Sequence, residues 1–160
     1  MAIAIGDKIP DVEIKTNGPE GPVPIRTGAV LGTGKVVLFA VPGAFTPGCS
    51  KIHLPGYVAR AADLKAKGVA TIACVAVNDP WVMQAWAEAQ GVGDAIVMLA
   101  DGNGEFTRAM GLELDGTGAG LGTRSQRYAA VVDDGVVTSL EVEPKSGVDV
   151  SSCENILAQL

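Results

Sequence analysis

Three cysteines are the residues of this chain best suited to covalent chemistry. Cys49, Cys74 and Cys153 are widely spaced, and none belongs to a Cys-x-x-Cys pair. An odd number of separated cysteines argues against a disulfide framework, and the lack of paired spacing argues against a structural zinc site. A free thiol that attacks an electrophile or becomes oxidised is therefore the first chemistry to consider.

The segment around Cys49 is expected to place its thiol where a strand ends and a helix begins. Positions 41 to 53 read VPGAFTPGCSKIH, with turn residues before the cysteine and helical spacing after it. In the first turn of a helix, unpaired N–H groups and the positive end of the helix dipole stabilise a thiolate over a thiol. The carboxyl ends of parallel strands are also where ligands bind in α/β sheets. Cys49 is therefore predicted to be a reactive thiolate at a ligand site.

Thr46 and Pro42 are suitably spaced to assist such a thiolate. Reduction of a peroxide needs a thiolate, hydrogen-bond donors for the charge that develops on oxygen, and a narrow pocket. Thr46 lies three residues before Cys49, and its hydroxyl could bond the thiolate or the bound peroxide. Pro42 has no N–H and would wall the site from competing water.

Arg127 is the expected source of a fixed positive charge. It directly precedes a predicted strand, Tyr128–Val132. If that strand is antiparallel to Lys35–Val41, its beginning lies beside the end of the latter, and Arg127 reaches Cys49. Arg124 is a second, supporting candidate.

Strands that alternate with helices must position these residues. Asp133-Asp134-Gly135 predicts a hairpin between the last two strands, and the glycine-rich segment Gly116–Gly122 predicts a long loop. Together the elements predict a three-layer α/β/α sandwich with a mixed central sheet. The predicted strands are Lys35–Val41, Val69–Val77, Ile96–Ala100, Tyr128–Val132 and Val136–Leu140, and the predicted helices are Cys49 to about Lys67, Pro80 to Gly91, Glu105–Met110 and Ser152–Leu160.

Helical spacing also predicts which side chains are buried. In the first helix Pro55-Gly56 predicts a kink, and in the second Asp79 is the expected cap. In the first helix Ile52, Tyr57 and Ala61 keep helical spacing. The residues expected to face the core are Val82, Trp86 and Ala89 in the second helix and Cys153, Ile156, Leu157 and Leu160 in the last.

Composition limits the class of protein. The chain has 160 residues, 48% hydrophobic and 19% charged, which suits a single domain spanning residues 1–160. A net charge of −6 without a basic run makes a nucleic acid or an anionic membrane an improbable partner. No apolar run approaches the roughly 20 residues that span a bilayer, and the start is not a secretory signal. A cytoplasmic location is expected, although a mature organellar protein would have the same features.

The motif Pro42-x-x-x-Thr46-x-x-Cys49 resembles the active-site pattern of the peroxiredoxin family, and the longer string VPGAFTPGCSK is similar to its type II, or type five, branch. The resemblance covers nearly the whole chain. It implies a thioredoxin-like fold with an added N-terminal β-hairpin, and thiol-dependent reduction of hydrogen peroxide and alkyl hydroperoxides without a cofactor or metal. Cys49 matches the peroxidatic cysteine, and Arg127 matches the active-site arginine. The other similar segments are Lys35–Val41, His53–Tyr57, Leu64–Gly68, Val77–Pro80, Leu99–Asp101, Gly122–Ser125, and Ile156, Leu157 and Leu160.

Four further residues are expected around the pocket: Gly48, Phe45, His53 and Arg124. His53 is four residues after Cys49, which also permits a Cys-His hydrolytic dyad, but no third residue can be assigned to orient it. His53 is better interpreted as lining the pocket or satisfying a backbone group. By the resemblance, the chain forms a homodimer, and Phe45 and Trp81, large aromatics near the predicted site, would serve its interface.

Oxidised Cys49 must be reduced again, and the sequence allows two reductants: a second cysteine of the chain or an external thiol. Cys74 lies 25 residues after Cys49, a spacing similar to that of the suggested resolving cysteine in plant-type members, yet its strand position predicts burial. Cys153 fits the buried stripe of the last helix, and Val150 aligns with the resolving position of animal-type members. Glutathione with glutaredoxin, or thioredoxin, is therefore the expected reductant. The alternative function is a peroxide-sensing switch or a holdase-like binding module that uses the same cysteine.

Overall fold

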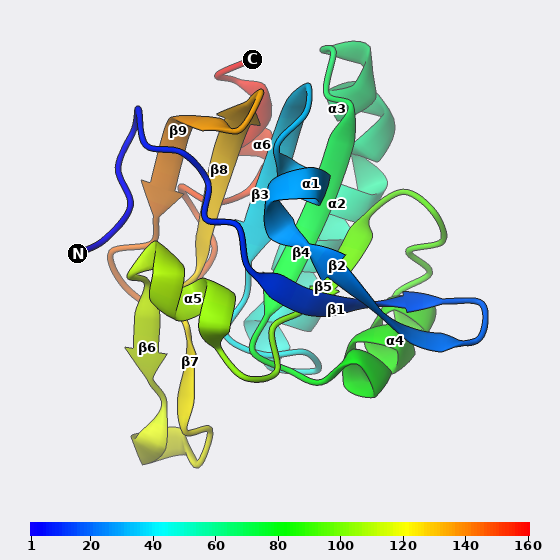
Figure 1. The fold of residues 1–160 in the computed structure, drawn as a ribbon, viewed down its shortest axis with the longest axis vertical. Helices are drawn as coiled ribbons and strands as arrows, with labels where there is room; N and C mark the ends of the chain where they lie inside the picture. Colours follow the sequence, from blue (N-terminus) through cyan, green and yellow to red (C-terminus); the bar gives the residue numbers. More distant parts are fainter.

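The computed structural model describes residues 1–160 and is built on one seven-stranded mixed sheet (Figure 1). Strands β3, β4 and β5 are parallel, whereas β8 is antiparallel to β3 and β1 is antiparallel to β5. The strands in spatial order are β2 (Gly21–Arg26), β1 (Glu13–Gly18), β5 (Val97–Ala100), β4 (Thr71–Ala76), β3 (Lys35–Ala40), β8 (Tyr128–Asp133) and β9 (Val136–Val142).

Helices cover both faces of this sheet, because alternate residues of the central strands are apolar on each side. In β3, Val37 and Phe39 belong to one core and Val36 and Leu38 to the other. The first core is covered by the π-helical turn η1 (Cys49–His53), α2 (Leu54–Ala59), α3 (Ala61–Ala66), α4 (Pro80–Ala89) and α6 (Cys153–Leu157), and the second by α1 (Thr27–Leu31) and α5 (Glu105–Met110). The three-layer α/β/α prediction is confirmed, including the N-terminal hairpin β1–β2.

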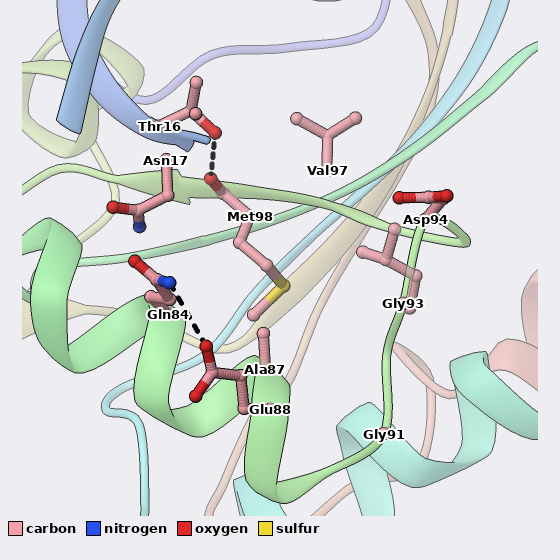
Figure 2. A pocket seen from close by; sticks show the side chains of 12 residues that line it. Thr16, Asn17, Gln84, Ala87, Glu88, Gly91, Gly93, Asp94, Val97 and Met98 are labelled. Atoms are coloured by element: carbon pink, nitrogen blue, oxygen red, sulfur yellow. Dashed lines mark hydrogen bonds between the residues drawn. The ribbon is translucent and has the colours of Figure 1, made fainter. Parts of the chain in front are cut away.

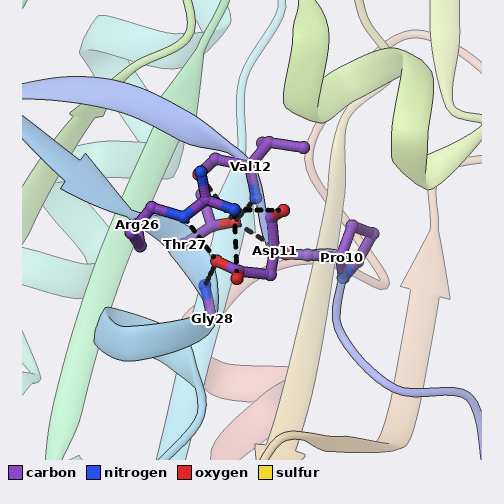
Figure 3. Close-up of polar contacts among 6 residues, drawn as sticks. All are labelled: Pro10, Asp11, Val12, Arg26, Thr27 and Gly28. Carbon is purple, nitrogen blue, oxygen red and sulfur yellow. Dashed lines mark hydrogen bonds and ion pairs between the residues drawn. The ribbon is translucent and has the colours of Figure 1, made fainter.

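Asp11 ties the residues before the hairpin to its far end (Figure 3). Its carboxylate accepts hydrogen bonds from the Arg26 guanidinium at 3.1 Å and from the Gly28 N–H at 3.1 Å. The Thr27 hydroxyl donates to the Pro10 carbonyl at 2.6 Å. The bond from Arg26 lowers the pKa of Asp11, but both side chains are solvent-exposed, so this pair contributes little stability. The contacts fix where β2 ends and α1 begins.

The glycine-rich segment 116–122 is a loop, as predicted, and it joins the two strands of a small β-ribbon. Strands β6 (Glu113–Asp115) and β7 (Thr123–Ser125) pair antiparallel, and the loop between them contains a 3₁₀ turn, Thr117–Ala119. The Gly116 N–H donates to the Gly122 carbonyl at 2.7 Å. Gly122 has a φ of 68°, a conformation that favours glycine, so it suits the closed end of this loop. The ribbon leads the chain directly to Arg127.

The helix that follows the turn after β3 begins at Pro47 and contains one π-helical turn. The Leu54 N–H bonds the carbonyl of Cys49, five residues back. A proline inside an α-helix clashes with the carbonyl four residues earlier, and a wider turn ahead of Pro55 relieves that clash. The predicted kink is thus a π-turn before Pro55 and a second break at Arg60.

The π-turn rotates the buried face of the helix, so the residues that keep helical spacing after Cys49 are not all buried. Ile52 is 57% exposed, and Leu54 is fully buried in its place. Tyr57 and Ala61, which follow the turn, are buried. In α4, Ala89 is exposed near the end of the helix, whereas Trp86 is fully buried.

The last helix, α6, is shorter than predicted. It spans Cys153–Leu157, and the Ser152 side chain caps it by accepting from the Asn155 N–H. None of the helices combines the length and apolarity that crossing a membrane requires.

Candidate active site

A tight turn between β3 and the following helix carries the motif residues. The Thr46 hydroxyl donates to the Gly43 carbonyl at 2.6 Å, and the Thr46 carbonyl accepts from the Ser50 N–H at 2.9 Å. Phe45 has a φ of 64°, which is uncommon for a residue other than glycine, and its side chain is 56% exposed. The turn therefore places the Thr46 side chain at the helix start and holds Phe45 outward.

Cys49 lies in the first turn of this helix and is fully buried. The N–H groups of Gly48 and Cys49 donate no hydrogen bond within the protein, as is usual for a first helical turn. Two donors and the positive end of the helix dipole thus lie beside the sulfur. A Cβ on Gly48 would lie 3.2 Å from Nη2 of Arg127, so glycine at this position leaves room for the guanidinium.

Arg127 reaches Cys49 as the predicted strand order requires. In the register of β3 and β8, Ala40 pairs with Tyr128, so the start of β8 lies beside the end of β3. The Nη2 of Arg127 donates to Sγ of Cys49 at 3.2 Å. Arg127 is half-buried, so solvent screens its positive charge at the sulfur less than it would at an exposed position.

His53 contacts Arg127 and not the Cys49 thiol. Its Nδ1 lies 2.9 Å from Nη1 of Arg127, and its Nε2 lies 3.0 Å from the Ser151 carbonyl oxygen. A guanidinium only donates, so Nδ1 accepts and the proton is on Nε2, which donates to Ser151. Burial, followed by the charge of Arg127, lowers the pKa of His53 to about 3. His53 is therefore a neutral acceptor for Arg127, which leaves no Cys-His dyad.

The neutral state of His53 makes stability depend on pH. The unfolded chain binds a proton on His53 below about pH 6.5, whereas the folded chain does so only near pH 3. Above about pH 6.5 the neutral imidazole of His53 contributes fully to the free energy of unfolding. As the pH falls toward 3 this contribution is lost, and the free energy of unfolding decreases by up to about 1.4 kcal/mol per pH unit. Denaturant unfolding across this range should show that slope in the wild type and not in His53→Gln. Equal slopes would contradict the assignment.

The remaining predicted residues surround the turn. Arg124 does not contact Cys49: its Nη1 donates to the Pro42 carbonyl at 3.3 Å and its Nε to the Leu121 carbonyl at 3.0 Å. Arg124 thus holds the turn that precedes the cysteine. Asn78 does the same from the end of β4, because its side-chain oxygen accepts from the Ala44 N–H at 2.9 Å.

Three residues with polar roles around the site are not predicted by spacing from Cys49. Asn78, Glu143 and Ser151 reach the site from two loops, and no spacing rule joins them to Cys49. Asn78 lies within the family-like segment Val77–Pro80, but that resemblance assigns it no role. Glu143 and Ser151 lie on the segment between β9 and α6, where no periodic pattern exists to read.

Cys74 and Cys153 are both buried, as their positions predict. Burial, with a smaller effect of the neighbouring Cys49, raises the pKa of Cys74 well above its usual value. Burial also raises the pKa of Cys153 to about 11. Since the thiolate is the attacking form, neither thiol is prepared to react with oxidised Cys49 in this conformation.

The largest cavity of the molecule lies away from this chemistry. It measures about 730 Å³ between β1, β5 and α4, and Figure 2 shows Thr16 and Gln84 among its walls. A smaller cavity of about 340 Å³ is lined by Pro42 and Arg127 and adjoins the site. Cys49 and its partners, not cavity size, identify the candidate active site.

The chain matches known proteins over almost its full length. Residues 4–157 match the family model described as Redoxin. "Peroxiredoxin-2E-2, chloroplastic" of Oryza sativa is 52% identical over 99% of this chain and 72% of its own length, and "Peroxiredoxin-2B" of Arabidopsis thaliana is 45% identical over 99% and 98%. The crystal structure of reduced Prx3 in complex with hydrogen peroxide from Vibrio vulnificus superposes with a TM-score of 0.93 at 52% identity, covering 98% of both chains.

These likenesses agree with the buried cysteine at the helix start and the arginine at 3.2 Å from its sulfur. They extend to the β1–β2 hairpin and the mixed sheet. The chain belongs to the redoxin family and is a peroxiredoxin of the type II kind, a thiol-dependent peroxidase.

Proposed function

We propose that Cys49 is the peroxidatic residue and that Arg127 is its principal electrostatic partner. The contact between Arg127 Nη2 and Cys49 Sγ is the observation that carries this assignment. The Cys49 thiolate attacks one peroxide oxygen, an S–O bond forms and the O–O bond breaks. The sulfur is oxidised to a sulfenic acid, and the departing oxygen takes a proton and leaves as water or an alcohol.

The other residues of the turn stabilise charge and exclude water. The N–H groups of Gly48 and Cys49, together with Arg127, face the oxygen on which negative charge develops. The Thr46 hydroxyl donates its proton to Gly43, so its oxygen can accept from the peroxide O–H and orient it. Pro42 walls the site, and Arg124 supports Pro42 through its carbonyl. The hydrogen peroxide bound to the Vibrio relative supports this substrate class.

We further propose that an external thiol, supplied by glutathione with glutaredoxin or by thioredoxin, reduces the sulfenic acid. The high pKa values of Cys74 and Cys153 and the burial of both side chains support this. After one equivalent of peroxide, mass spectrometry should find oxidised Cys49 that a dimedone-type reagent traps. A rapid Cys49–Cys74 or Cys49–Cys153 disulfide within one chain would defeat the proposal.

The reductant is then identified by turnover. Peroxide consumption measured side by side with a thioredoxin system and a glutaredoxin system distinguishes the two reductants. Steady consumption with at least one of them supports the proposed function, whereas inactivity with both, in a protein whose Cys49 becomes oxidised, would oppose it.

A homodimer is proposed through the exposed apolar side chains of Phe45, Ile52 and Trp81. These three side chains are 56%, 57% and 67% exposed, and Phe45 and Ile52 lie on the active-site turn and on the helix after it. Large exposed apolar side chains are typical of interfaces. Sedimentation should show a dimer for the wild type and a smaller species for Trp81→Glu, and a monomer in both would contradict it.

We also propose that residues 1–160 act as one domain in a reducing compartment. The sheet uses strands from β1 to β9, which supports one folding unit. The three free cysteines support a compartment such as the cytoplasm or an organelle of the kind named for the rice relative.

A further inference from the structure

Glu143 gathers three donors on one carboxylate oxygen. It follows β9, and its Oε2 accepts from the Asp149 N–H at 2.8 Å, the Ser151 N–H at 2.8 Å and the Ser151 hydroxyl at 2.6 Å. Burial alone would raise the pKa of Glu143, but these hydrogen bonds outweigh it and lower the pKa below its usual value. The carboxylate thus holds the loop from Glu143 to Ser151 in one conformation.

The loop from Glu143 to Ser151 is connected to Arg127 by two separate sets of hydrogen bonds. The carbonyl of Ser151, which is fully buried, accepts from His53 Nε2 at 3.0 Å and from the Tyr57 hydroxyl at 2.8 Å. His53 then accepts from the Arg127 guanidinium through Nδ1. Separately, the Glu143 N–H donates to the Arg127 carbonyl at 3.0 Å. Arg127 is therefore held at both its main chain and its guanidinium by groups that meet at Glu143.

We propose that Glu143 is a positioning residue for the peroxidase reaction: through Ser151 and His53 it holds the Arg127 guanidinium against the Cys49 sulfur. The proposal rests on the role given to Arg127 above. The carbonyl of Ser151 fixes the proton of His53 on Nε2, which leaves Nδ1 as an acceptor for Arg127. If the loop moved, His53 would lose that partner and the guanidinium would lose one of its two restraints.

The first test reads the imidazole directly. His53 is the only histidine of the chain, so the ¹⁵N spectrum of the imidazole reports one residue. At neutral pH the wild type should show a protonated Nε2 and an unprotonated Nδ1. In Glu143→Ala the two signals should move toward each other as the tautomers mix, whereas Glu143→Gln, which keeps an acceptor oxygen, should stay near the wild-type pattern. An unchanged spectrum in Glu143→Ala would overturn the proposal.

The second test separates positioning from general loosening of the fold. Glu143→Ala should slow the reaction of Cys49 with peroxide about tenfold, since small displacements of a charged group are costly in catalysis. In an Arg127→Ala background the same change should have almost no further effect, because its effect passes through the arginine. A tenfold loss in both backgrounds would show a merely structural role. Glu141→Ala is the matched control, since Glu141 lies on β9, just before Glu143, and its side chain bonds only Gln159.

The outcomes also separate the proposed function from the proposed role of Glu143. A normal rate in Arg127→Ala would defeat the proposed function itself. A slow Arg127→Ala with a normal Glu143→Ala would defeat only the role of Glu143. Ser151→Ala, which removes the hydroxyl donor at 2.6 Å and keeps the N–H and the carbonyl of residue 151, provides a second variant that should show the same dependence on Arg127 if Glu143→Ala does not fold.

Discussion

Replacement of Cys49 by serine is expected to abolish turnover of peroxide while leaving the fold in place. A serine hydroxyl is not ionised near neutral pH, and its oxygen cannot be cycled between reduced and oxidised states as sulfur can. The side chain is fully buried and of similar shape, so the structure needs little adjustment. Peroxide consumption with excess thiol reductant measures the loss.

Cys153→Ala is the control for this experiment. Cys153 is buried in α6, far along the chain from the active-site turn, and no role in the chemical step is proposed for it. The control should keep a near-normal rate of Cys49 oxidation. Normal turnover in Cys49→Ser, or loss of the reaction in Cys153→Ala with its fold intact, would contradict the assignment of Cys49.

Arg127→Ala should slow the attack on peroxide at least tenfold, which corresponds to roughly 1.4 kcal/mol or more of lost transition-state stabilisation. The change removes the donor at 3.2 Å from the sulfur and the positive charge that would stabilise the departing oxygen. Rapid-mixing measurements of sulfenic acid formation report this rate.

The matched control for Arg127 is Arg60→Ala. Arg60 is on the surface and pairs with Asp63 at 3.0 Å, so the same loss of charge there should leave the rate within a small factor of the wild type. An Arg127→Ala variant that reacts as fast as Arg60→Ala would remove the electrostatic basis of the proposed mechanism.

The position of Arg127 can be predicted from the sequence because the order and direction of two strands determine it. Lys35–Val41 and Tyr128–Val132 are both apolar runs, and the antiparallel arrangement places the end of one beside the beginning of the other. The same reasoning from turn residues and apolar runs predicts the sheet and its two helical layers. Local sequence patterns are therefore enough to predict a contact when the order of the strands and helices determines it.

Local patterns fail where a contact depends on geometry within one turn. The π-turn at Cys49–His53 shifts the helix face by a residue, so Ile52 is exposed and His53 points to Arg127. Helical spacing assumes a regular helix and cannot show that shift. Glu143 and Ser151 lie on a loop that is held by hydrogen bonds between them, and no periodic pattern in the sequence predicts these bonds.

The most direct test of the central claim is the number of peroxide molecules that each Cys49 consumes in the presence of a thiol reductant. A peroxidase built on Cys49 and Arg127 consumes peroxide steadily, through many cycles, until the reductant or peroxide is exhausted. A protein that consumes about one equivalent and then stops, with Cys49 oxidised and reductant still present, would be a redox sensor and not a peroxidase.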